Sequence, residues 1–153
     1  MPAPWEVRET YEVRAELEGL ACERAVGRIT GEVLDELGKV NEALRPGATA
    51  VGGTSTAAND RFHTLIHGVA GNERLARIIK EINEAFPRNV SASVLQNNPR
   101  HRADNFAEHE RIIAAFAAGD AHLARREMQA HVISAGVQLA RWYENRSAAV
   151  FRG

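Results

Sequence analysis

Apolar residues recur at intervals of three and four along almost the whole chain, and strong helix-ending signals divide this pattern into segments. Such spacing is typical of helices that bury one face. No stretch shows the alternation of apolar and polar residues, bounded by turn residues on both sides, that a half-buried strand would give. The sequence therefore predicts an all-α fold, an antiparallel bundle of six to seven helices.

Capping residues and breaks set the expected helix bounds. Thr30, Asn72 and Asp120 are candidate N-caps, Pro46-Gly47 and Gly119 end helices, and Pro87 should kink or end another. The predicted helices span about residues 6–26, 30–45, 54–69, 72–86, 103–118 and 120–146, with a further short segment through 90–95. The small, polar stretch 46–56 is expected to be a flexible loop between helices.

Length and composition exclude several classes of protein. A chain of 153 residues is long enough for one domain with a sizeable core, so residues 1–153 are expected to form a single domain. The net charge of −1 gives no electrostatic reason for nucleic-acid binding. No apolar run could span a bilayer, and the N-terminus lacks the features of a signal peptide. With a single cysteine, Cys22, these features predict a cytoplasmic protein without membrane association.

Four potential metal ligands lie on three of the predicted helices: Asn59 and His63 on one, His109 on another and His131 on the last. Asn59 and His63 are one helical turn apart and share a face. The three histidines lie on or beside apolar faces, where an imidazole without a partner is costly. If these faces pack inward, three imidazoles and an amide oxygen can bind one divalent ion and leave coordination positions open.

Two neighbouring residues leave this ligand set open. Asp60 could replace Asn59 as the oxygen ligand, because a carboxylate is in general the better metal ligand. His67 forms its own one-turn pair with His63 but falls toward the rim of the apolar face, and it is a secondary candidate for a ligand or pocket residue. His101 and His122 lie near helix starts and are expected to be solvated.

Several motifs, taken in order, resemble a known domain. They are residues 59–63 (Asn-Asp-Arg-Phe-His) followed by 70–72 (Ala-Gly-Asn), residues 108–113 (Glu-His-Glu-Arg-Ile-Ile), and residues 124–131 with the pattern A-x-x-x-M-x-x-H. Together with the opening stretch 11–18, they are similar to the FCD domain. That domain is the effector-binding, C-terminal part of FadR-branch regulators in the GntR family of bacterial transcription factors. The resemblance extends over about residues 11–142.

The resemblance implies a ligand set and an effector contact. It places metal ligands at Asn59, His63, His109 and His131, and it places Arg14 where the family's first-helix arginine contacts the effector's carboxylate. Most members have Asp at the first of these positions. The asparagine here removes a negative charge, which should weaken metal affinity and favour an anionic effector. From the residues alone, Arg14 could instead pair with Glu18 across one turn of the helix surface.

The leading hypothesis is therefore a ligand-sensing and dimerisation domain of a GntR/FadR-type regulator. It would bind a divalent metal, zinc first among zinc, nickel, manganese and iron, and a small carboxylate effector in the bundle core. The resemblance implies a homodimer that reaches DNA only through a winged helix-turn-helix domain of a parent protein, since this sequence shows no such domain. The alternatives are a small helical metalloenzyme, for which no general base is clearly placed, and a structural dimer with packed histidines.

Overall fold

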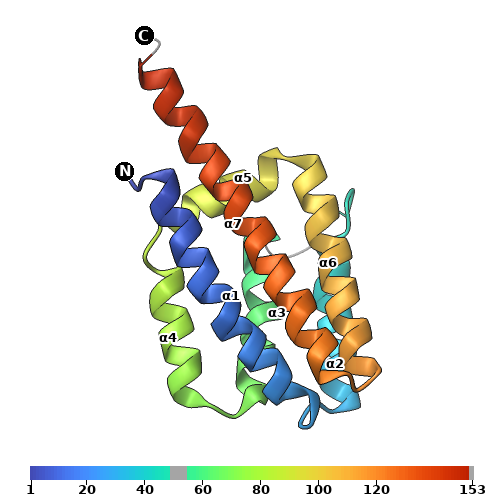
Figure 1. Cartoon of the computed structure of the whole chain (residues 1–153). Coiled ribbons are helices and arrows are strands. Elements are labelled where there is room, and N and C mark those ends of the chain that lie inside the picture. Colours follow the sequence, from blue (N-terminus) through green and yellow to red (C-terminus); the bar gives the residue numbers. More distant parts are fainter. Residues whose placement is uncertain (49–54, 152–153) are drawn as a thin grey trace.

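The computed structural model describes residues 1–48 and 55–151, and all regular structure within these ranges is helical (Figure 1). The helices are α1 (Pro4–Val26), α2 (Gly31–Glu42), α3 (Ser55–Ala70), α4 (Glu73–Asn83), α5 (Arg88–Asn97), α6 (Pro99–Ala117) and α7 (Ala121–Phe151). The predicted all-α bundle is confirmed. Most of the loop predicted over 46–56 lies outside the described residues. Among the described helices, none is both long and apolar enough to cross a bilayer.

Short polar side chains fix where three of the helices begin. Each accepts a hydrogen bond from the backbone N–H three residues further on, at 3.0–3.3 Å, and they are Thr30 before α2, Asn72 before α4 and Asp120 before α7. These bonds satisfy donors that a helix start leaves without an internal partner. The predicted caps are thus present where the sequence placed them.

The start of α6 differs from the prediction. The helix begins at Pro99 rather than near residue 103, because Asn98 Oδ1 accepts the backbone N–H of His101 at 3.0 Å. Proline suits the first turn of a helix, where its missing N–H costs no hydrogen bond. The extra turn brings His101 into the helix.

Helices α1 and α7 lie side by side and antiparallel, with the start of α1 and the end of α7 at the same end of the bundle (Figure 1). They approach closely at Gly136, where an added Cβ would be only 2.6 Å from Cβ of Tyr11. Helix α3 contacts α1, α2, α4 and α5, and α6 packs on α2 and α7. Side chains from α1, α3, α6 and α7 can therefore meet in the interior.

Polar groups gather in this interior beside a large apolar cluster. Phe62, Ile66, Ile112 and Met128 are completely buried members of that cluster. The buried polar side chains of the described chain are Glu18, Asn41, His63, His67, His101, Asn105, His109 and His131. Because burial of a polar group is costly unless it gains a partner, this group marks the region where a function would be found.

Candidate functional site

Three histidines from three helices meet in the interior of the bundle. Nε2 of His131 on α7 lies 3.1 Å from Nε2 of His109 on α6 and 3.3 Å from Nε2 of His63 on α3. Two nitrogens that bind one ion at about 2.0–2.1 Å would be roughly 3.0–3.4 Å apart. The observed spacing fits ligands of a shared divalent ion, and the buried group could hold one.

Each of these rings has an oxygen atom facing its other nitrogen. The Nδ1···O distances are 2.9 Å from His63 to Glu18, 3.0 Å from His109 to Asn41 and 2.7 Å from His131 to Glu108. Metal-binding histidines commonly have such oxygen partners, which fix the orientation of the ring and its tautomer.

The orientation of the Asn41 amide decides the tautomer of His109. Nδ2 of Asn41 donates to Oε1 of Glu110 at 2.9 Å and faces the backbone oxygen of Phe106 at 3.3 Å, so Oδ1 is turned to His109. His109 therefore carries its proton on Nδ1 and leaves a lone pair on Nε2. Oε1 of Glu108, 2.7 Å from Nδ1 of His131, favours the same tautomer there, and the charge of Glu18, 2.9 Å from Nδ1 of His63, favours it in the third ring. Three lone pairs then point at one another, an arrangement that a bound cation would stabilise.

Packing and burial keep two of the rings in place and without charge. Phe62 stacks on His109 with ring centroids 3.8 Å apart and planes 2° from parallel. Burial lowers the pKa of His63 to about 4, against the opposing effect of Glu18, and it holds the pKa of His109 well below its ordinary value. Both rings are therefore neutral at neutral pH, which is the form that binds metal.

Glu18 on α1 is completely buried and joins Arg14 to the histidines. Its Oε2 lies 2.8 Å from Nη2 of Arg14 and 2.9 Å from Nδ1 of His63, and its Oε1 contacts Nε2 of His67. Burial alone would raise the pKa of Glu18, but His63 and Arg14 hold it well below its ordinary value. Glu18 is thus an ionised carboxylate whose counter-ion is Arg14.

The structure places Arg14 and His67 inside the bundle, whereas the sequence allowed a surface position for Arg14 and predicted a position near the rim for His67. Arg14 does pair with Glu18, but the pair is inside the bundle, with the Arg14 side chain 11% exposed. His67 is also nearly buried and contacts Glu18 rather than the three converging nitrogens. Glu18, His63 and His67 are close enough to hold an ion of their own. Because Arg14 already neutralises Glu18, this second group is better described as the support of the first.

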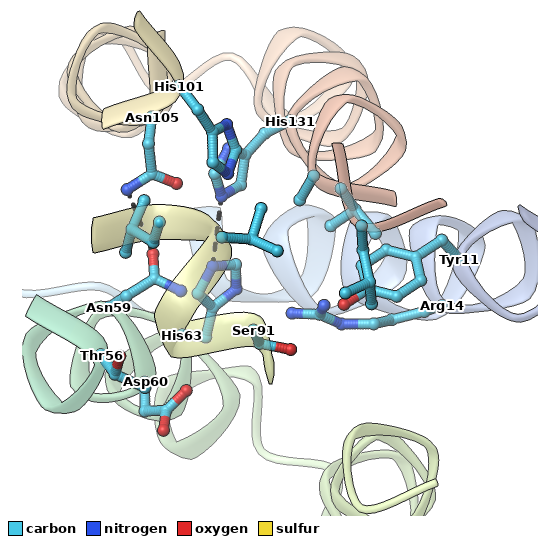
Figure 2. A pocket seen from close by; sticks show the side chains of 15 residues that line it. Tyr11, Arg14, Thr56, Asn59, Asp60, His63, Ser91, His101, Asn105 and His131 are labelled. Atoms are coloured by element: carbon cyan, nitrogen blue, oxygen red, sulfur yellow. Dashed lines mark hydrogen bonds between the residues drawn. The ribbon is translucent and has the colours of Figure 1, made fainter. Parts of the chain in front are cut away.

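A cavity of about 70 Å³ lies beside the histidines (Figure 2). Its wall includes these sequence candidates: Arg14, Asn59, Asp60, His63 and His131. Figure 2 shows Arg14 reaching in from α1 and the amide of Asn59 beside the ring of His63, whereas the carboxylate of Asp60 points away from the histidines. Oδ1 of Asn59 accepts a hydrogen bond from Nδ2 of Asn105 at 3.3 Å.

The expectation that His101 is solvated is wrong. The residue is only 6% exposed and lines the same cavity, because α6 begins earlier than predicted. His101, Asn105 and His109 follow one another at intervals of four, so they share one face of α6. This spacing was the signal that could have identified His101. The partners Glu18, Asn41 and Glu108 gave no comparable signal, since they depend on contacts between distant helices.

Comparison with protein families identifies the domain family of this chain. The FCD domain family matches residues 9–134, which is most of the chain. The chain belongs to the FCD domain family. An FCD domain is the effector-binding domain of GntR/FadR-type regulators, as the motifs implied. A comparison with curated proteins found no match.

The cavity of this FCD domain has polar atoms in its wall that find no hydrogen-bond partner among the described residues. They include Nε of Arg14, Oγ1 of Thr56 and Nδ1 of His101, from α1, α3 and α6. Nδ1 of His63 also lacks a partner with hydrogen-bond geometry, although Oε2 of Glu18 lies 2.9 Å from it. Buried polar atoms in folded proteins are nearly always paired. A wall with several unpaired donors and acceptors is suited to a small polar ligand.

Proposed function

We propose that this FCD domain senses a small carboxylate effector in the presence of a divalent metal ion held by His63, His109 and His131. The observation that carries the proposal is the convergence of three Nε2 atoms at 3.1 and 3.3 Å, each ring with an oxygen atom at its Nδ1. Zinc suits three neutral imidazoles best, and nickel, manganese and iron are also compatible with nitrogen and oxygen ligands. When bound, the ion supplies an electrophilic anchor for a carboxylate.

Arg14 is proposed as the second anchor of the effector. Its Nη2 is engaged by Glu18, but its buried Nε has no partner among the described residues and its side chain lines the cavity. A carboxylate is the natural partner for a guanidinium in such a place, because charge-assisted hydrogen bonds are strong in a desolvated site. The cavity of about 70 Å³ has room for a small acid.

The setting of the domain is proposed from its family. We propose that the domain acts as a homodimer in the cytoplasm, within a regulator whose winged helix-turn-helix domains contact DNA. Effector binding would favour one conformation of the bundle and so change how those domains are held relative to each other.

The metalloenzyme alternative lacks a placed general base. Glu108 faces Nδ1 of His131 and is not part of the cavity wall. Among the described residues, the carboxylate that lines the cavity is Asp60, which points away from the histidines (Figure 2). A water molecule activated by an ion would need a base within hydrogen-bond reach. We therefore favour sensing over catalysis.

Asn59 and Asp60 should differ in their effect on metal affinity. We propose Asn59 as the oxygen ligand, because its amide lies beside His63 and one turn before it (Figure 2). Asn59→Ala is expected to weaken zinc binding about tenfold or more, and Asp60→Ala much less. Asn59→Asp should strengthen it, since it restores a negative charge. Competition titration with a zinc chelator measures all three, and a larger loss for Asp60→Ala would reverse the assignment.

The effector proposal is tested on metal-loaded protein with a panel of short carboxylic acids. Isothermal titration should find at least one acid that binds the wild type, and Arg14→Lys should bind it about tenfold more weakly because lysine lacks the planar fork of donors. Arg8→Lys is the matched control, since Arg8 is an exposed arginine on the same helix that pairs with Glu144. If no acid binds the metal-loaded wild type, the carboxylate-sensing function is wrong.

A further inference from the structure

His101 is a cavity residue that the proposed function does not yet use. It lies one turn before Asn105 and two turns before His109 on α6, and it is 6% exposed. Its backbone N–H is bonded to Asn98 Oδ1 at 3.0 Å, so the helix start is fixed by Asn98 and not by the imidazole. The imidazole is therefore available for another role.

The surroundings of His101 differ from those of the three converging histidines. An oxygen atom lies 2.7–3.0 Å from Nδ1 of each of those rings, although the contact between His63 and Glu18 lacks hydrogen-bond geometry. Nδ1 of His101 is buried without a hydrogen-bond partner among the described residues. Oγ1 of Thr56, from α3, is unpaired in the same wall. Two neutral polar groups thus face a cavity whose cationic group is Arg14.

The neutral imidazole of His101 and the cationic guanidinium of Arg14 enter the cavity from different helices. Figure 2 shows His101 reaching in from α6 and Arg14 from α1, with His63 and His131 also in the wall. Burial lowers the pKa of His101, so its ring is neutral at neutral pH. A neutral imidazole suits a hydroxyl or a carbonyl oxygen better than a second carboxylate. The wall therefore offers one site for an anionic group and a separate one for an uncharged oxygen.

We propose that His101 is a specificity-determining residue that hydrogen-bonds a hydroxyl or keto oxygen on a short carboxylic acid bound at Arg14. This inference rests on the proposed function and narrows its effector class from small carboxylates to short hydroxy or keto acids. An acid without the second oxygen would leave Nδ1 of His101 buried and unpaired, and it would bind more weakly for that reason.

Matched pairs of acids test the role of His101. Zinc-loaded protein is titrated calorimetrically with lactate against propionate, 3-hydroxybutyrate against butyrate, and pyruvate against propionate. The wild type should prefer the oxygen-bearing member of at least one pair about tenfold or more. His101→Phe and His101→Ala should reduce that ratio to about one while leaving the affinity for the plain acid within about threefold. His122→Ala, at an exposed histidine on α7, is the matched control.

The outcomes separate this inference from the proposed function. An unchanged preference in folded, zinc-loaded His101 variants overturns the inference alone. Failure of every acid to bind the wild type overturns the proposed function and the inference with it. If neither variant folds, nitrogen-15 resonances of the His101 ring in the wild type decide. They should move on addition of the preferred acid and not with its plain partner, and equal shifts with both would contradict the proposal.

Discussion

Replacing His109 and His131 together by alanine should abolish stoichiometric metal binding. The wild type is expected to carry about one ion per chain, because three Nε2 lone pairs from His63, His109 and His131 are preset to share it. The double variant retains a single imidazole of that set. The measurement is metal content by mass spectrometry on protein purified without chelator or histidine tag.

His122→Ala serves as the control for the metal measurement, since His122 is exposed on α7, the helix that also carries His131. It should leave the metal content unchanged. Absence of metal in the wild type, even after incubation with zinc and nickel, would rule out the metal-anchored mechanism. The effector hypothesis would then rest on Arg14 and a cavity without an ion.

Glu18→Ala should cause the largest loss of stability among single substitutions at the site. Glu18 is completely buried and contacts Arg14, His63 and His67, so its removal leaves a buried guanidinium without its counter-ion. Breaking a buried ion pair from one side costs about 3–5 kcal/mol. The free energy of unfolding of the metal-free protein, from urea titration, measures the effect. Glu16→Ala, at an exposed position on the same helix, should stay within about 0.5 kcal/mol of the wild type.

A double substitution checks the cause of that loss. Arg14→Met combined with Glu18→Leu removes both charges. This double variant should have a larger free energy of unfolding than Glu18→Ala, because no charge is left buried without a partner. If Glu18→Ala costs no more than Glu16→Ala, the ion pair has no structural importance. If the double variant is the less stable of the two, the loss comes from packing instead.

Most of the fold could be predicted because its signals are local. Thr30, Asn72 and Asp120 cap helices through bonds to residues three positions on, and such bonds depend only on the sequence around them. The start of α6 was misplaced because Asn98-Pro99 combines a cap with a residue that also ends helices. That one error accounts for the wrong expectation about His101.

The candidate site could be predicted only in its innermost part. His63, His109 and His131 stand on apolar faces, and burial of those faces brings the rings together. Their oxygen partners could not be read in the same way, because Glu18 and Asn41 are typical surface residues until a neighbouring helix covers them. Such pairings depend on which helices are adjacent and on how far each helix is shifted along its axis relative to its neighbour. No local sequence pattern encodes this.

The pairing of Arg14 with Glu18 also bears on what the cell can detect. The two charges cancel within the bundle, and the imidazoles of His63 and His109 are neutral, so these groups alone give an anion little reason to enter. On the proposed function, a bound divalent ion supplies the missing positive charge. The domain would then respond to the coincidence of two signals. A cell starved of the metal would respond to the acid only at higher concentrations.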